Sequence, residues 1–127
     1  MRILVLSDSH GAVEACRLAV EQSTPDQILH LGDCVRDAER LHALFPAIPL
    51  TGVPGNCDWA DADNPERLIE LGGVRILMMH GHTHRPLVDW DGTLWVMNPG
   101  SIRDRRTYGV ITLEGGKIDC AVQTLTP

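Results

Sequence analysis

Residues 3–10 read ILVLSDSH, in which four apolar residues are followed closely by an aspartate and a histidine. A short, continuous apolar run is typical of a strand that is buried on both faces, as in a parallel sheet. Residues 12–22 carry apolar side chains at helical spacing, and Pro25 stands just after them. The order strand, polar residues, helix predicts an α/β domain with polar side chains at the strand ends.

The same pattern continues along the chain. Strands are expected at 27–31 and 48–53, separated by a helix over 37–45 that Pro46 ends. Two further strands, 67–71 and 74–79, are predicted on either side of Gly72-Gly73, after a polar loop over 58–65.

The final third of the chain reads differently. Strands are expected at 93–97, 107–113 and 117–125, and Gly115-Gly116 separates the last two. A βαβαβ half followed by a mostly β half predicts two packed sheets with helices on the outside. A chain of 127 residues fits one domain over residues 1–127.

Composition excludes several classes of protein. A net charge of −6 argues against a protein that coats nucleic acid, because neutralising phosphates needs a basic face. No apolar run approaches the length of a membrane span, and the run at residues 3–6 is too short for a signal peptide. The cysteines at 16, 34, 57 and 120 form no C-x-x-C pair, so we expect free thiols in a cytoplasmic protein.

Four polar clusters each follow a predicted strand. They are Asp8-Ser9-His10, Gly32-Asp33, Gly55-Asn56-Cys57-Asp58 and His80-Gly81-His82-Thr83-His84. Because the carboxyl ends of parallel strands meet at one edge of a sheet, we expect these clusters to converge. Mixed oxygen and imidazole ligands suit Mn, Fe, Co, Ni or Zn better than Ca or an all-oxygen Mg site. The sequence therefore predicts a transition-metal centre.

Taken singly, three of the clusters have ordinary structural interpretations. Asp8 could cap a helix, Asp33 could be a turn residue, and Gly55-Asn56 is a common turn dipeptide. Three histidines at alternate positions from 80 to 84 are harder to explain without a metal. The metal interpretation therefore depends on all four clusters occurring in this order.

These clusters resemble the motifs D-x-H, G-D, G-N-H-[DE] and G-H-x-H of the calcineurin-like metallophosphoesterases. The small YfcE-type phosphodiesterase branch is the most similar in its details. The features that carry this likeness are LHLGDC at 29–34, the variant GNCD at 55–58, and NPGS at 98–101 after a strand.

The resemblance implies a four-layer αββα sandwich and two divalent transition-metal ions. Mn is the first expectation, and Ni, Fe, Co and Zn are alternatives. By this resemblance, the first ion would be bound by Asp8, His10 and His84. Asp33 would bridge the two ions, and Asn56 and His82 would bind the second ion. A metal-bound hydroxide would then attack a small phosphodiester, with nucleotides among the candidates, while Asn56 and His82 orient the phosphate.

Two departures from the family pattern stand out. Cys57 replaces a histidine that assists the leaving group, which favours diesters or good leaving groups. Family members also have one strand that ends in a histidine, then a helix, and then a second strand that ends in the G-H-x-H motif. In this chain the single histidine and the G-H-x-H motif follow one another directly at residues 80–84. His80 is then a further ligand candidate for the second ion, and the fold is shortened by about one helix and one strand.

The missing strand would leave an open sheet edge. Such an edge invites another chain to pair with it, so we expect a homodimer, with exchanged elements as one form. The rival function is a catalytically weak or inactive scaffold that binds a partner protein, as the retromer subunit of this fold does.

Three further features have two interpretations each. His30 is expected to be a buried, hydrogen-bonded histidine beside the site rather than a ligand. Trp59 could stack on an aromatic substrate or pack in the core. The arginines at 103, 105 and 106 could hold a phosphate or form a solvated surface.

Overall fold

The computed structural model describes residues 1–32, 35–53, 66–79 and 86–126. Along the chain the elements are β1 (Arg2–Leu6), α1 (Val13–Ser23), β2 (Gln27–His30), α2 (Val35–Leu44), β3 (Leu50–Gly52), β4 (Glu66–Leu71), β5 (Val74–Met79), β6 (Leu87–Trp90), β7 (Trp95–Asn98), β8 (Thr107–Glu114) and β9 (Lys117–Thr124).

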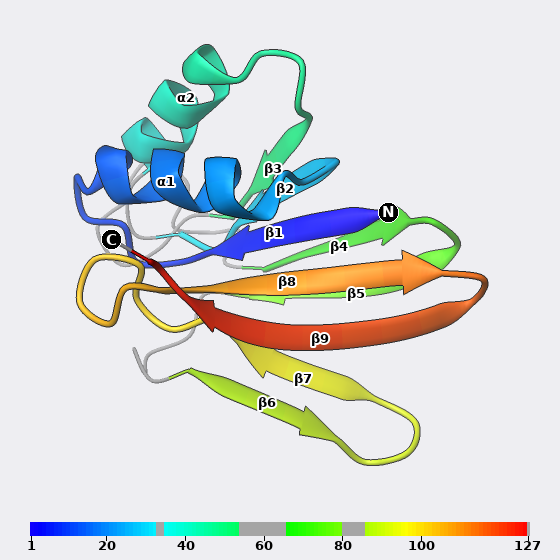
Figure 1. Ribbon diagram of the computed structural model, residues 1–127. Helices are drawn as coiled ribbons and strands as arrows, with labels where there is room; N and C mark the ends of the chain where they lie inside the picture. Colours follow the sequence, from blue (N-terminus) through cyan, green and yellow to red (C-terminus); the bar gives the residue numbers. More distant parts are fainter. Residues whose placement is uncertain (33–34, 54–65, 80–85, 127) are drawn as a thin grey trace.

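A five-stranded mixed sheet with the order β3-β2-β1-β8-β9 forms the centre of the fold. The first three strands run parallel to one another, and β8 and β9 are antiparallel to their neighbours. Both helices lie on one side of this sheet (Figure 1). The parallel arrangement brings the carboxyl ends of β1, β2 and β3 to a common edge, as the sequence predicted.

The other side of the sheet carries two antiparallel hairpins, β4-β5 and β6-β7 (Figure 1). β1 explains why both sides are covered. Its residues Leu4 and Leu6 pack with the helices, whereas Ile3 and Val5 pack with the hairpins. All four side chains are at most 3% exposed, so the continuous apolar run belongs to a strand that is buried on both faces.

The predicted elements are confirmed with small shifts at their ends. The β6 strand was not expected, since its sequence LVDW is short and carries an aspartate. The strand predicted at 93–97 lies at 95–98, and the helix predicted at 37–45 lies at 35–44. The loop predicted at 58–65 lies outside the described residues.

The layers differ from a complete four-layer sandwich. Within the described ranges, helices cover only one of the two outer faces, so this part of the fold has three layers: helices, central sheet and hairpins. This agrees with a metallophosphoesterase fold that is shortened by about one helix and one strand. None of the helices described is both long and apolar enough to cross a membrane.

Candidate metal centre

The segments that follow β1 and β2 are joined directly by backbone hydrogen bonds. The N–H of Asp8 donates to the carbonyl of Gly32 at 3.2 Å, and the N–H of Leu31 donates to the carbonyl of Leu6 at 2.7 Å. The first predicted cluster therefore lies beside the start of the second, as expected for neighbouring parallel strands.

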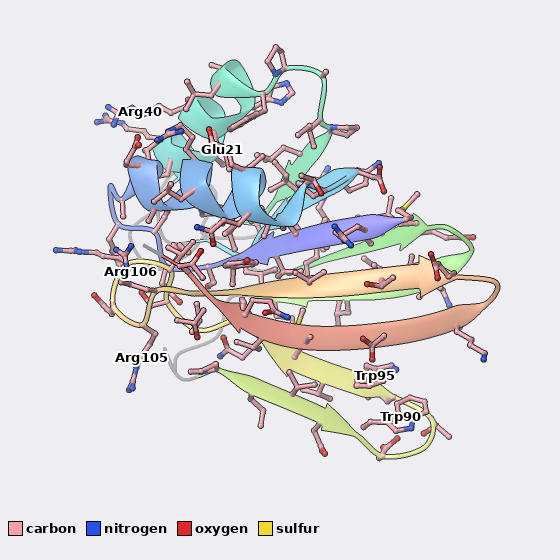
Figure 2. All side chains as sticks on the ribbon, in the orientation of Figure 1. Glu21, Arg40, Trp90, Trp95, Arg105 and Arg106 are labelled. Carbon is pink, nitrogen blue, oxygen red and sulfur yellow. The ribbon has the colours of Figure 1, made fainter. Side chains whose placement is uncertain are left out.

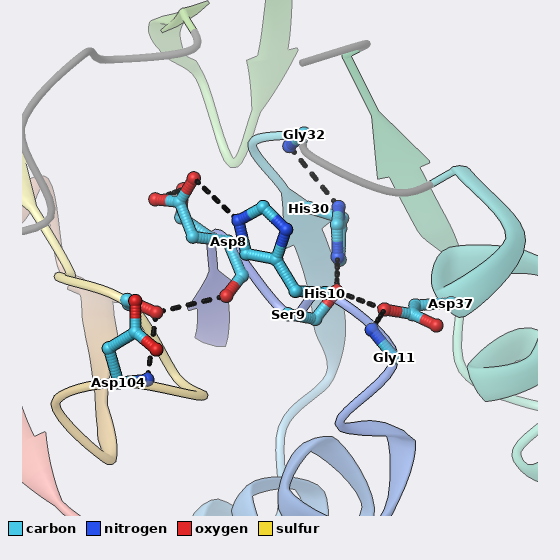
Figure 3. Close-up of polar contacts among 10 residues, drawn as sticks. Asp8, Ser9, His10, Gly11, His30, Gly32, Asp37 and Asp104 are labelled. Atoms are coloured by element: carbon cyan, nitrogen blue, oxygen red, sulfur yellow. Dashed lines mark hydrogen bonds and ion pairs between the residues drawn. The ribbon is translucent and has the colours of Figure 1, made fainter. Parts of the chain in front are cut away.

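Asp8 and His10 are the two predicted ligands within the described residues, and they approach each other. Asp8 Oδ1 lies 4.0 Å from His10 Nε2 (Figure 3), and the Asp8 side chain is 1% exposed. Ser7 Oγ donates a hydrogen bond of 2.9 Å to Asp8 Oδ2. The carboxylate is thus held at one oxygen while the other faces the imidazole.

The backbone of this loop adopts a conformation that is costly for residues with side chains. Asp8 has φ 55° and His10 has φ 43°, both in the left-handed region. That region costs a residue other than glycine roughly 1–2 kcal/mol. Two such residues in a span of three are typical of functional sites, where surrounding contacts hold a strained conformation in place.

The chemistry of this pair fits a transition-metal ion. One carboxylate and one imidazole match the donor set that such ions prefer. Bonds from zinc to a carboxylate oxygen and to an imidazole nitrogen are each about 2.1 Å, so two donors of one tetrahedral ion lie about 3.4 Å apart. Asp8 Oδ1 and His10 Nε2 lie 4.0 Å apart, so a shared ion would draw the two side chains closer together.

The other predicted ligands, Asp33, Asn56, His80, His82 and His84, lie outside the described residues, as do Cys57 and Trp59. Their roles therefore stay predictions. Within the ranges that the structure covers, no group of three or more histidine, cysteine, aspartate or glutamate side chains gathers.

A buried hydrogen-bond network supports the loop from the helix side (Figure 3). The N–H of Gly32 donates to Nδ1 of His30 at 3.2 Å, which assigns the ring proton to Nε2. Nε2 then donates to Ser9 Oγ at 3.1 Å, and Ser9 donates onward to Asp37 Oδ2 at 2.6 Å. The same Asp37 oxygen accepts the N–H of Gly11 at 2.7 Å.

This network, formed by His30, Ser9 and Asp37, links the β1–α1 loop to the end of β2 and to the first turn of α2. His30 is 1% exposed, so its predicted role as a buried, hydrogen-bonded histidine is confirmed. Ser9 and Asp37 were not recognised from the sequence as supporting residues. An aspartate in the first turn of a helix is ordinarily explained by the helix dipole, so its local pattern gave no further signal.

A turn after β7 supports the loop from the opposite side. Ser101 Oγ donates to the carbonyl oxygen of Asp8 at 3.0 Å and accepts the N–H of Asp104 at 2.9 Å. The N–H of Ile102 donates to the carbonyl of Ser7 at 3.0 Å. The NPGS segment at residues 98–101 therefore supports the backbone of Asp8 through a hydrogen bond.

The arginines that follow this turn are exposed at all three positions, 103, 105 and 106. Figure 2 shows Arg105 and Arg106 pointing outward from the turn. Of the two interpretations open from the sequence, the solvated surface fits these side chains better.

The family model described as the calcineurin-like phosphoesterase superfamily domain matches residues 1–81 and 75–116. The chain belongs to the calcineurin-like phosphoesterase superfamily. The two matches overlap at residues 75–81, so this segment of the chain is matched twice by the family model. Such an overlap is expected if the family's two strands that end in histidine are represented here by a single strand.

Curated relatives agree with this membership. The chain is 36% identical over 87 residues to the probable metallophosphoesterase YsnB of Bacillus subtilis, covering 66% of this chain and 48% of that protein. It is 30% identical over 132 positions to a probable metallophosphoesterase of Methanocaldococcus jannaschii, covering 80% of this chain and 68% of that protein. The chain thus spans about half of the first relative and about two thirds of the second.

Solved structures show the same fold. A Streptococcus pneumoniae protein described as a predicted phosphoesterase matches with a TM-score of 0.76 at 21% identity, over 97% of this chain and 88% of that chain. Vps29 from Chaetomium thermophilum matches with a TM-score of 0.69 at 17% identity, over 100% of this chain and 96% of that chain. Zinc-complexed Vps29 from Entamoeba histolytica matches with a TM-score of 0.67 at 16% identity, over 99% of this chain and 100% of that chain. At these identities the likeness establishes the fold alone.

Proposed function

We propose that this member of the superfamily is a phosphodiesterase that depends on divalent transition-metal ions. Membership of the family supports a metal-dependent phosphoesterase in general terms. The observation that carries the proposal is the pair Asp8 and His10, whose donor atoms lie 4.0 Å apart on a strained and doubly supported loop.

The proposed ligand set follows the family pattern. Asp8, His10 and His84 would hold one ion, Asp33 would bridge, and Asn56, His80 and His82 would hold a second. When bound, such ions lower the pKa of a coordinated water and neutralise charge on a phosphate. The contribution of Ser7 and of the His30–Ser9–Asp37 network is to keep Asp8 and His10 oriented before a metal or substrate arrives.

The substrate class is part of the proposal. A small phosphodiester is favoured because Cys57 stands where a leaving-group histidine is common, and a thiol is a poorer acid for a phosphoester oxygen. Asn56 and His82 would orient its phosphate, and Mn is the first metal to try. We place the reaction in the cytoplasm, and the free thiols of the buried Cys16 and Cys120 support this.

The test combines metal content with turnover. Protein stripped with a chelator is reloaded with Mn²⁺, its bound metal is measured by mass spectrometry, and hydrolysis of bis-p-nitrophenyl phosphate is followed. Asp8→Asn and Asp33→Asn should each lose metal and at least 100-fold in Mn-dependent turnover. Asp119→Asn, an exposed change on β9, is the matched control. Turnover like that of the unmodified protein in Asp33→Asn would contradict the mechanism.

A second candidate is a catalytically weak scaffold that binds a partner protein. The observations that favour it are the overlap of the two family matches at residues 75–81 and the likeness in fold to Vps29. Unmodified protein that takes up no metal and shows no turnover would support this candidate over the phosphodiesterase.

A further inference from the structure

An exposed segment rich in arginine follows the NPGS segment at one flank of the candidate metal centre. Residues 102–106 read IRDRR, with three arginines and one aspartate, so their net charge is +2. The arginines at 103, 105 and 106 are all exposed. Within the ranges that the structure covers, none of these three arginines forms an ion pair. We call residues 102–106 the arginine turn.

Hydrogen bonds hold the backbone of the arginine turn in a defined place. The N–H of Arg105 donates to the carbonyl of Ser101 at 2.9 Å, and the carbonyl of Arg106 accepts the N–H of Leu125 at 2.8 Å. Arg106 also has φ 56°, a left-handed conformation that is unfavourable for a residue other than glycine. The positive charges therefore stand on a backbone that contacts outside the turn keep in position.

The arginine turn begins beside a predicted metal ligand. Ser101 Oγ donates to the carbonyl oxygen of Asp8 at 3.0 Å. Figure 3 shows the turn, marked by Asp104, next to Asp8. Arg103 follows Ser101 by two residues, which span at most about 7 Å of chain. This separation is comparable with the screening length of about 10 Å in 0.1 M salt, so the charges of the turn act on the region around Asp8.

The remaining charges of the chain make this positive segment stand out. The whole chain has a net charge of −6, so it repels an anion at long range. On the other flank of the ligand loop, residues 35–40 of α2 contain two arginines and two acidic residues and have no net charge. The segment 58–65 contains three aspartates and neither lysine nor arginine. Of these segments, the arginine turn is the one that favours the approach of an anion.

We propose that the arginine turn attracts phosphodiesters that carry a further phosphate and directs them to the metal centre. The inference rests on the proposed function, because it names the substrates that the same site would prefer. The exposed arginines stay solvated and act through their electric field, without contact with the substrate. A cluster of cations beside a site raises both the local concentration of an anion and its rate of association, and both effects fall with ionic strength. A diester with a single negative charge gains least.

Two thymidine dinucleotides with the same diester bond test this preference. TpT carries one negative charge, whereas pTpT has the same linkage and a terminal phosphate in addition. The turn variant, Arg103→Gln with Arg105→Gln, removes two charges and should raise the KM for pTpT about 10-fold in low salt. The KM for TpT should rise less. For both dinucleotides kcat should change by less than about two-fold, because the field acts on the approach of the substrate.

The matched control removes two positive charges from the opposite end of the molecule. Arg75 and Lys117 are exposed and lie beside the β4-β5 and β8-β9 turns, at the end of the sheet away from the carboxyl end of β1 (Figure 1). Arg75→Gln with Lys117→Gln changes the net charge by the same amount as the turn variant. Its KM for pTpT should stay within about two-fold of that of the unmodified protein. At about 1 M salt all three proteins should agree, since the screening length falls to about 3 Å.

A KM for pTpT that is the same in the turn variant and the unmodified protein would overturn the proposal. An equal rise in both variants would also overturn it, because net charge alone would then explain the effect. Hydrolysis of bis-p-nitrophenyl phosphate in about 1 M salt tests the proposed function separately. If the unmodified protein hydrolyses this compound while the turn variant keeps its KM for pTpT, the present inference alone fails.

A binding measurement decides the inference where pTpT is not hydrolysed. Equilibrium dialysis with pTpT and Mn²⁺ in low salt compares the same three proteins. Binding that is about 10-fold weaker in the turn variant than in the other two proteins supports the proposal. Equal binding by all three proteins refutes it, whether or not the proposed function holds.

Discussion

Ser9 Oγ donates a hydrogen bond of 2.6 Å to Asp37 Oδ2, a contact between residues 28 positions apart that is fully buried. Ser9 stands between Asp8 and His10, so this bond holds the predicted ligand loop against the first turn of α2. The two left-handed residues on either side of Ser9 need such support, because their backbone conformation is unfavourable by itself.

The first prediction concerns Asp37. Asp37→Ala removes the acceptor of both Ser9 Oγ–H and Gly11 N–H, so the free energy of unfolding should fall by about 1–3 kcal/mol. Mn²⁺ affinity should fall roughly 10-fold or more, because the loop loses its orientation. Asp37→Asn keeps one oxygen for both donors and should recover most of each loss.

Urea unfolding and titration calorimetry measure these two quantities. Glu39→Gln, an exposed change on the same helix, serves as the control for helix effects. If Asp37→Ala loses stability but binds Mn²⁺ normally, the network is structural only.

The second prediction concerns strain at His10. His10→Gly should abolish binding of the first ion yet leave the melting temperature at or above that of the unmodified protein. Relief of the left-handed conformation contributes about 1–2 kcal/mol, while the added chain entropy of glycine costs about 0.5–1 kcal/mol. Thermal unfolding of chelator-treated protein measures the effect.

Thr24→Gly provides the comparison for His10→Gly. Thr24 has φ 45° at the end of α1, so the same relief applies there without any role in the metal centre. Metal binding should be unchanged in that variant. A fall of several degrees in His10→Gly would show that His10 is not strained.

The third prediction contrasts two buried hydroxyls. Ser101 Oγ has both a donor and an acceptor role, so Ser101→Ala should lower the free energy of unfolding by about 1–3 kcal/mol. Thr107 Oγ1 is buried and, within the described structure, has no hydrogen-bond partner. Thr107→Val should therefore be neutral or stabilising by up to about 1 kcal/mol. Urea unfolding ranks the two variants, and a larger loss at Thr107 would contradict this assignment.

The fourth prediction concerns pH. Burial, and next the negative charge of Asp37, raises the pKa of the Cys16 thiol from 9.0 to about 12. Above pH 9 the thiol of the unfolded chain loses its proton, whereas the buried thiol of the native protein keeps it up to about pH 12. The stabilisation that Cys16 contributes to the native state is therefore complete below pH 9 and is lost between pH 9 and about 12. Each pH unit in that window should cost up to about 1.4 kcal/mol.

Unfolding in urea at pH 8, 9, 10 and 11 measures how steeply the free energy of unfolding falls with pH. Cys16→Ala removes this contribution, so its stability should fall less steeply with pH than that of the unmodified protein. Cys120, whose pKa burial raises to about 11, is present in both proteins and cancels in the comparison. Equal slopes would show that Cys16 does not titrate differently on unfolding.

The sequence alone identified the elements whose signals are local. The apolar run at residues 3–6, the glycine pairs at 72–73 and 115–116, and the helical spacing over 12–22 predicted strands, hairpins and a helix close to their observed positions. The burial of His30 was also predictable, because this histidine lies in an apolar strand beside a motif. The metal-binding roles of Asp8 and His10 remain predictions.

Tertiary structure decided what depends on residues that are distant in the chain. The bond between Ser9 and Asp37, the support of Asp8 by Ser101, and the outward position of Leu68 and Leu77 all arise from packing between elements. The reason is physical: periodicity and turn chemistry act over a few residues, whereas hydrogen-bond partners and exposed faces depend on which elements come together in space.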